Sequence, residues 1–90
     1  MRKIEKQMIA AIDENKTFGS DNTLVKNVGQ NHASVYLHHQ HIADVINGTV
    51  LVNVATLRNY PTNTTKSRLR ALGAHLVSKK GQLFLDDVLI

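Results

Sequence analysis

The chain lacks cysteine and tryptophan, contains one proline, and only 4% of its 90 residues are aromatic. The absence of cysteine excludes disulfide bonds, thiolate catalysis and cysteine-ligated zinc fingers. The few aromatic residues are scattered along the sequence, which argues against an aromatic platform that stacks single-stranded nucleic acid. No apolar run is long enough to cross a membrane. We therefore expect an intracellular soluble protein with no membrane partner and a core of Val, Leu, Ile and Ala.

Positive charge is unevenly distributed along the chain. There are 11 Lys and Arg against 7 Asp and Glu, which gives a net charge of +4. Between Arg58 and Lys80 no acidic residue interrupts the basic ones, whereas Asp86 and Asp87 follow this stretch. A local positive field of this kind permits an anionic partner but does not require one.

Residues 2–15 are predicted to form an N-terminal helix. Ile4, Met8, Ala11 and Ile12 recur at helical spacing and make one apolar stripe. We expect this stripe to pack on a sheet or on a partner subunit.

Turn residues divide the next segment into strands. Residues 18–22 and 29–31 are rich in Gly, Asn, Asp and Gln and predict turns, with a strand over 23–28 between them. Apolar residues then alternate with polar or aromatic ones over 33–38, which is the period of a strand buried on one face.

Asn47-Gly48 is the strongest local signal, because a type I′ turn needs positive φ at both central residues. This turn should join Ile42–Ile46 to Thr49–Leu57 as a hairpin. The predicted register pairs Ile46 with Thr49, Val45 with Val50, Ala43 with Val52 and His41 with Val54. One face of the hairpin is then core, and we expect the other to be half covered by the N-terminal helix or another subunit.

A second helix is predicted near 63–72. Pro61 disfavours helical geometry at the residue before it, and Thr62, Asn63 or Thr64 can cap the exposed N–H groups that follow. Gly73 can end the helix in a left-handed conformation.

The predicted helix 63–72 has one docked and one cationic side. Leu69 and Leu72 share the docked stripe with Thr65, and Arg68 lies at its edge, where we expect the guanidinium to reach solvent or an anion. The opposite side carries Asn63, Lys66, Ser67 and Arg70.

A β-hairpin with a basic tip should follow this helix. Lys79-Lys80-Gly81 predicts a tight turn, and Val77 then lies opposite Phe84. Residues 86–90 end on apolar side chains and are expected to form a final strand or a docked end. The order is α-β-β-β-β-α-β-β, an α+β fold in a single domain over residues 1–90 that is small enough to leave a homodimer open.

The helix and hairpin over Thr62–Leu85 follow the order of the recognition helix and wing in winged-helix DNA-binding domains. The β-branched run before Pro61 predicts a strand where such domains have helices, so full membership is not expected. A helix and a basic hairpin tip that share one surface can still contact neighbouring phosphates, whatever the rest of the fold. This gives six candidate nucleic-acid-binding residues: Lys66, Ser67, Arg68, Arg70, Lys79 and Lys80. The alternative is an ordinary amphipathic helix with a solvated charged face.

Three histidines, His38, His39 and His41, invite comparison with a metal site. On a regular strand His39 and His41 share one face and Asp44 lies on the other, so too few ligands converge. The spacing of hydroxyl, histidine and carboxylate residues along the chain does not bring them together as a catalytic triad. We expect no metal, no cofactor and no enzymatic activity.

The chain resembles a group of small uncharacterised tailed-phage proteins over about residues 20–85. The segments that carry the resemblance are Asn22-Thr23-Leu24-Val25, Val35-Tyr36-Leu37-His38 with Ile42-Ala43, and Thr56 to Leu72 with its Thr-Thr-x-x-Arg-Leu-x-Ala-Leu pattern. His39 and Gln40 stand where the group has Gly-Asn, which makes a tight turn there less expected. The resemblance implies a phage origin and a location in the host cytoplasm, and brings no established activity.

Two hypotheses of function follow. The first is a small phage accessory protein that binds nucleic acid, with DNA favoured over RNA, through the basic helix and hairpin tip. The second is a protein-binding module that inhibits or redirects an acidic host factor.

Overall fold

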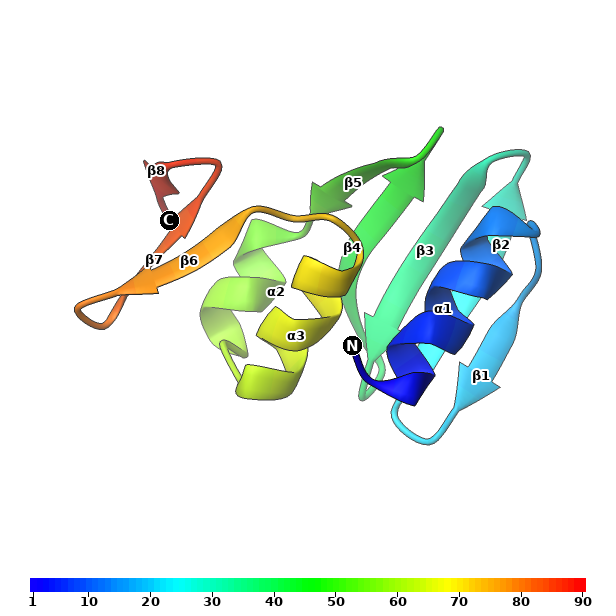
Figure 1. Ribbon diagram of the computed structural model, residues 1–90, viewed down its shortest axis with the longest axis horizontal. Coiled ribbons are helices and arrows are strands. Elements are labelled where there is room, and N and C mark those ends of the chain that lie inside the picture. The colour runs from blue at the N-terminus through cyan, green and yellow to red at the C-terminus, as the bar shows by residue number, and fades with distance from the viewer.

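A five-stranded antiparallel sheet forms the body of the protein, and a three-stranded antiparallel sheet projects from it (Figure 1). The computed structural model describes residues 1–90. The elements are, in chain order, α1 (Lys3–Asp13), β1 (Phe18–Ser20), β2 (Thr23–Gly29), β3 (His32–Leu37), β4 (Gln40–Ile46), β5 (Thr49–Val52), α2 (Val54–Asn59), α3 (Asn63–Ala71), β6 (Leu76–Lys79), β7 (Gln82–Leu85) and β8 (Val88–Leu89). The predicted α+β class is confirmed, with the N-terminal helix, the helix near 63–72 and the hairpin after it.

Helix α1 packs on one face of the five-stranded sheet (Figure 1). Met8 and Ala11 are buried, and Ile4 and Ile12 are half-buried, so the predicted apolar stripe is confirmed. Glu5 is also buried on this helix, which the hydrophobic pattern does not predict. The core that α1 covers unites residues from both sheets and all three helices.

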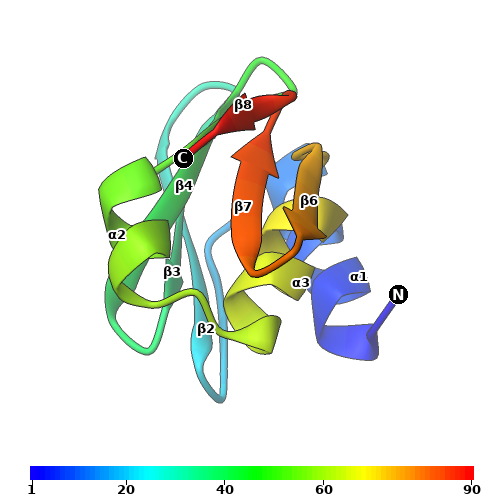
Figure 2. The same cartoon turned by 90° about the vertical axis from the view of Figure 1, so that its left-hand side faces the viewer.

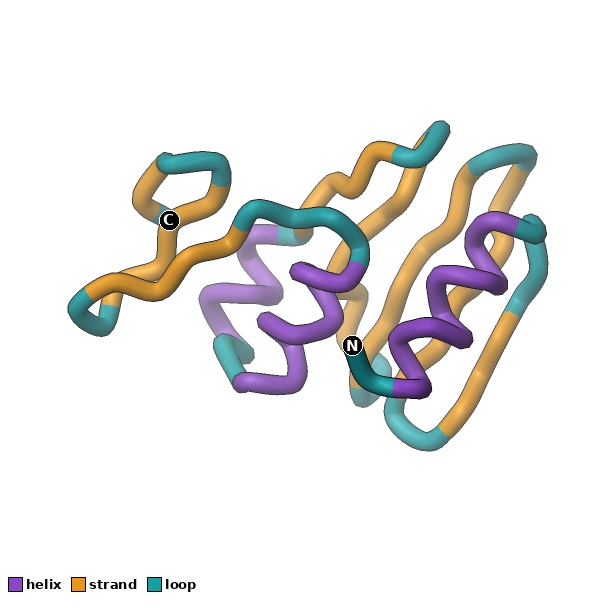
Figure 3. The backbone as a smooth tube through the Cα atoms, in the orientation of Figure 1, coloured by secondary structure: helices purple, strands orange, loops and turns teal.

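Two-residue turns connect several of the strands, and Figure 3 shows them as short loops. Asn47 and Gly48 have φ of 51° and 80°, and Lys80 and Gly81 have 50° and 77°, so both predicted hairpin turns are confirmed. His38 and His39 form a third such turn, with φ of 50° and 67°. The departure from Gly-Asn in the tailed-phage pattern therefore does not remove the tight turn.

A β-bulge interrupts the pairing of β3 with β4. Tyr36 pairs with His41 but its neighbour Val35 pairs with Ala43, so Ile42 is an extra residue in β4. Ile42 and Ala43 are both buried as a result. Because of this bulge, Gln40 and His41 lie on the opposite faces of the sheet from those they would occupy in a regular strand.

The strand predicted over Thr49–Leu57 is correct for its first four residues and wrong for the rest. The first three predicted pairs of the hairpin are confirmed, but β5 ends at Val52 and His41 has no partner at Val54. The chain instead enters α2, whose N-cap Asn53 accepts a hydrogen bond from the Thr56 backbone N–H at 3.2 Å. This cap and the burial of Leu57, which is 1% exposed, override the strand propensity of the β-branched run.

The face of the five-stranded sheet opposite α1 carries exposed apolar side chains. Leu24 and Leu51 are exposed there. The expectation that α1 half covers this face is wrong, because Met8 packs with Val25 and Val35 on the other side.

The structure contains two short strands, β1 and β8, of which only β8 was expected. β1 occupies part of the segment 18–22 that was expected to be a turn, and the turn is confined to Asp21 and Asn22. β8 confirms the expected final strand and pairs with β7 at the edge of the smaller sheet.

Candidate nucleic-acid interface

The smaller sheet contacts α3 through β6 and borders α2 across a groove, and Figure 2 looks onto this side of the molecule. The helix and the hairpin tip that the sequence singled out therefore border one region. The six candidate residues divide into two groups. Lys66, Arg70, Lys79 and Lys80 form no ion pair, whereas Ser67 and Arg68 belong to a buried network.

Arg68 is 3% exposed, so the expectation that its guanidinium reaches solvent is wrong. Its Nη1 lies 2.8 Å from Glu5 Oε2, and its Nε donates to Thr23 Oγ1 at 3.1 Å. Ser67 Oγ donates to the same Glu5 oxygen at 2.6 Å. The anion that Arg68 meets is thus a carboxylate of its own chain, and neither Ser67 nor Arg68 offers its polar group to a ligand.

The pKa of the Glu5 carboxyl lies below its ordinary value of 4.5. Burial by itself raises this pKa, but hydrogen bonds from Ser67, Arg68 and the Arg2 backbone N–H, with the charge of Arg68, outweigh it. The network therefore holds Glu5 ionised, and it ties α1 to α3 and to the start of β2.

A sequence signal for this network does exist. Glu5 lies between Ile4 and Met8 on the apolar side of α1, and an ionised side chain is buried only with a partner. Arg68 at the edge of another apolar stripe is the matching cation. Both residues can be found from their helical positions, but their pairing needs the tertiary structure.

Of the remaining cations, Lys66 lines a groove of about 510 Å³ between α2, α3 and the smaller sheet. We call it the α3–hairpin groove, and it is lined by Arg58, Pro61, Lys66, Ser78, Gly81, Gln82, Leu83, Leu89 and Ile90. Arg58 was not among the predicted site residues, because its segment was expected to be a strand that ends at Leu57. Helix α2 brings it to the groove.

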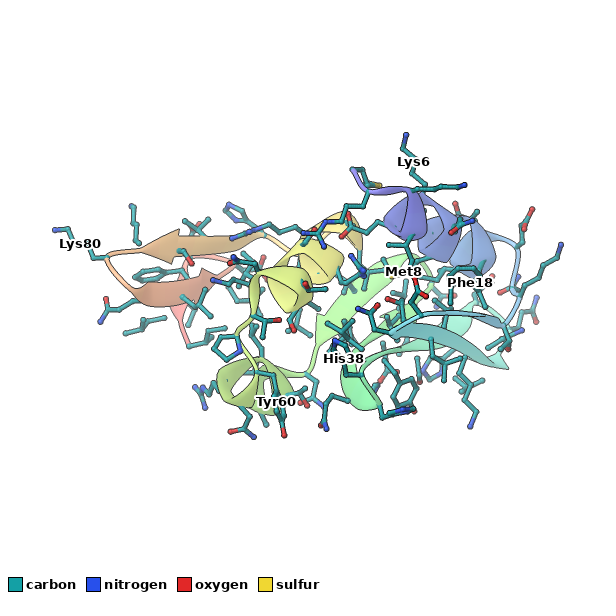
Figure 4. All side chains as sticks on the ribbon, turned by 90° about the horizontal axis from the view of Figure 1, so that it is seen from below. Lys6, Met8, Phe18, His38, Tyr60 and Lys80 are labelled. Carbon is teal, nitrogen blue, oxygen red and sulfur yellow. The ribbon has the colours of Figure 1, made fainter.

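Arg70 and the tip lysines do not line this groove. Arg70 is one helical turn from Lys66, and its Nε donates to the Leu76 carbonyl oxygen at 2.8 Å, which holds the start of β6 against α3. Lys79 and Lys80 are exposed at the hairpin tip, and Figure 4 shows Lys80 pointing away from the body of the protein.

The acidic residues of the smaller sheet lie at its other end. Asp86 and Asp87 form the turn between β7 and β8, and β7 runs from the basic tip to this turn. The Asp86 backbone N–H donates to the His75 carbonyl oxygen at 3.0 Å, next to the start of β6. The hairpin thus separates its positive tip from its negative end by the length of a strand.

The histidine region is arranged differently from the prediction. His39 lies in a turn, and the bulge at Ile42 turns His41 to the same face as Asp44, so the expectation that these two oppose each other is wrong. His41 Nε2 lies 3.1 Å from Asp44 Oδ1, and the His41 ring packs on Tyr36 at 5.1 Å.

Asp44 is the centre of this second polar cluster. Ser34 Oγ donates to Asp44 Oδ1 at 2.6 Å, and His32 Nε2 is 3.7 Å from the same oxygen. Burial by itself raises the pKa of Asp44. The hydrogen bonds from Ser34 and His41 and the charges of both histidines lower it by more, so the pKa lies below its ordinary value of 3.8. No group of three or more His, Cys, Asp or Glu side chains is placed to hold a metal ion.

Comparison with known proteins identifies the family of this chain. No curated protein and no solved structure matches it. None of its helices is long and apolar enough to span a membrane. The family model of the Kyanoviridae Gp96 protein matches residues 1–89. The chain therefore belongs to the Kyanoviridae Gp96 family, and it is a small tailed-phage protein.

Proposed function

We propose that this phage protein binds nucleic acid, with DNA favoured over RNA, in the host cytoplasm. The binding region is the cationic surface, which we define as Arg58, Lys66, Arg70, Lys79 and Lys80. The observation that carries the proposal is that these cations come from α2, α3 and the hairpin and form no ion pair, and that two of them, Arg58 and Lys66, line one groove. Because Arg68 is neutralised by Glu5, it is not part of this surface.

The arrangement suits a phosphate backbone. Unpaired Lys and Arg side chains release counterions from nucleic acid when they contact phosphates, and this supplies most of the affinity that does not depend on sequence. The half-buried Lys66 is partly desolvated, which strengthens its attraction to an anion. The exposed tip lysines extend the contact beyond the groove.

Binding measured against salt tests the proposal. We expect the logarithm of the association constant for a fluorescent DNA duplex to fall linearly with the logarithm of salt concentration, with a slope of about 0.9 for each phosphate contacted. The double change Lys79→Ala and Lys80→Ala should weaken binding and reduce the slope by about 1.8. The matched control Lys3→Ala with Lys6→Ala removes the same charge from α1, where Figure 4 shows Lys6 on the side away from the sheet, and should change neither.

Failure of the unmodified protein to bind duplex DNA, single-stranded DNA or RNA at low salt would contradict the proposal. Equal effects of the two lysine pairs would also contradict it, since they would reflect net charge and not this surface.

A protein-binding role is the second candidate. The observation that favours it is the sheet face opposite α1, where Leu24 and Leu51 are exposed, because exposed apolar residues on such a face often mark a protein contact. An acidic host factor would also be attracted to the cationic surface. Co-purification of one host protein at high salt, without nucleic acid, would favour this function over the first.

We also propose that the protein acts by binding and not by catalysis. Ser34 Oγ donates to Asp44, a carboxylate whose lowered pKa makes it a weak base, and His41 contacts this carboxylate and not the serine. The serine–histidine hydrogen bond that activates a nucleophilic serine is therefore absent. Arg68 and Glu5, the other buried polar pair, are occupied by each other.

A further inference from the structure

We propose that the α3–hairpin groove holds one unpaired nucleotide of a single strand, with its phosphate on Arg58 and Lys66 and its base against Leu83, Leu89 and Ile90. This inference rests on the proposed nucleic-acid binding and specifies the form of the ligand. It distinguishes a groove that takes a base from a surface that only touches the backbone.

The groove has two chemically different sides. Arg58 and Lys66 come from α2 and α3 and supply positive charge, whereas Leu83, Leu89 and Ile90 come from the end of the chain and are aliphatic. No acidic side chain lines it. A nucleotide has the same division, since its phosphate is anionic and its base presents a flat apolar face.

The polar side chains of the groove have no partners in the protein. Arg58, Lys66, Ser78 and Gln82 line the groove, and none of them makes a side-chain hydrogen bond or ion pair. By contrast, Arg70 and Arg68 on the same helix as Lys66 are both hydrogen-bonded within the chain. Donors left free around a partly buried cation are suited to the several acceptor oxygens of a phosphate.

The aliphatic side is open to water. Leu89 is 54% exposed although it lines the groove, and Leu83 and Ile90 are half-buried beside it. A base laid on these side chains would remove their apolar surface from water. The groove volume of about 510 Å³ lies within the range of about 300–1,000 Å³ that small-molecule sites occupy. The sequence argues against an aromatic stacking platform. In this groove the base would contact aliphatic side chains instead.

The ligand must be unpaired for a geometric reason. A base inside a duplex is stacked on both faces and paired at its edge, so it reaches a protein groove only after it leaves the stack. A single strand presents its bases without that cost. We therefore expect the protein to prefer single strands to duplexes of equal length.

The test uses fluorescence anisotropy with three probes of twelve nucleotides: oligothymidylate, its duplex with oligoadenylate, and oligouridylate. At moderate salt we expect the better single strand to bind at least several-fold more tightly than the duplex. Binding of either single strand supports the proposal, and the two probes differ both in the sugar and in the C5 methyl group of the base. The change Lys66→Gln should reduce the salt slope for the single strand by about 0.7, the value for one phosphate contact.

Two neighbouring residues of β8 provide a matched pair of variants. Leu89 lines the groove and Val88 does not, although both are exposed, at 54% and 62%. Leu89→Ala should weaken single-strand binding by about three- to tenfold, because part of the apolar contact with the base is lost. Val88→Ala should leave the affinity unchanged. Urea unfolding of both variants verifies that they fold like the unmodified protein.

Separate outcomes reject this inference and the proposed function. If the protein binds no nucleic acid at all, both are wrong. If it binds duplex as tightly as single strands, or if Leu89→Ala and Val88→Ala bind alike, the cationic surface stands but the groove does not take a base. As an independent measurement, the methyl resonances of Leu83 and Leu89 should shift when oligothymidylate is added, and their constancy at saturation would also overturn the inference.

Discussion

The role of an individual charged residue here depends on its partner. Arg68 and Glu5 have side chains that are 4% and 3% exposed, and their charges are compensated by each other, by Thr23 and by Ser67. Arg58 and Lys66 belong to the same basic stretch of sequence but have no such partners. One class of residue therefore serves the fold and the other remains available to a ligand.

Removal of one partner of the buried pair should destabilise the fold strongly. We expect Arg68→Met to lower the free energy of unfolding by about 3–5 kcal/mol, because Glu5 is left as a buried unpaired charge. The double variant Arg68→Met with Glu5→Leu should recover most of that loss, which urea unfolding would measure. Additive losses in the double variant would show that the two side chains do not depend on each other.

The lowered pKa of Glu5 predicts a loss of stability in acid. Between the lowered pKa of the folded state and the ordinary 4.5, the unfolded state binds more protons, so the free energy of unfolding rises with pH. The stabilisation is fully present above about pH 4.5 and is lost as the pH falls through the folded pKa. Urea unfolding between pH 3 and 6 should show a weaker pH dependence for Glu5→Gln. Glu14→Gln, which alters an exposed carboxylate at the end of the same helix, should keep the dependence of the unmodified protein.

At the scale of elements, α3 links the two sheets. Thr62 caps its start, and Arg70 in its last turn holds the Leu76 carbonyl of the smaller sheet. Gly73 follows with φ of 106°, a conformation that residues with a side chain rarely adopt, and lets the chain leave the helix toward β6. The position of the groove therefore depends on where α3 begins and ends.

The cap at Thr62 can be tested on its own. Its Oγ1 accepts a hydrogen bond from the Thr65 backbone N–H at 3.1 Å and contacts the Thr65 hydroxyl at 2.9 Å. Thr62→Ala should lower the free energy of unfolding by about 1–2 kcal/mol, since the N–H and the buried Thr65 hydroxyl lose a partner. Asn63→Ala, at the adjacent exposed position without a side-chain hydrogen bond, is the control and should cost clearly less. Equal losses would mean that Thr62 does not act as a cap.

The two sheets of the whole molecule differ in how deeply they are buried. The central strands β3 and β4 contribute many of the core side chains, whereas no residue of β7 or β8 is fully buried. Figure 1 shows the smaller sheet extending from the rest of the protein. A region with few buried apolar contacts opens at lower free energy than the core does.

Hydrogen exchange should report this difference. We expect the backbone amides of β3 and β4 to exchange most slowly and those of β8, an edge strand, to exchange fastest among the strands. An occupied α3–hairpin groove should slow exchange in β8 and leave β3 unchanged. Uniform protection across both sheets would show that the smaller sheet is as firmly held as the larger one.

The sequence alone determined the features that depend on neighbouring residues. The α1 stripe, the turns at Asn47-Gly48 and Lys80-Gly81, and the cap of α3 each follow from local backbone geometry or helical spacing. The α+β class followed from them. The strand predicted beyond Val52 failed because propensity is a weak preference, which the Asn53 cap and the burial of Leu57 overcame.

The tertiary structure decided which charges are free. Arg68 and Lys66 are two positions apart on α3, and no local rule says that one faces Glu5, more than sixty residues away, while the other faces the groove. The bulge at Ile42 likewise placed His41 beside Asp44, against the alternation of a regular strand. Burial and pairing between distant segments are set by how the layers pack, and this is why the candidate surface changed while the fold class did not.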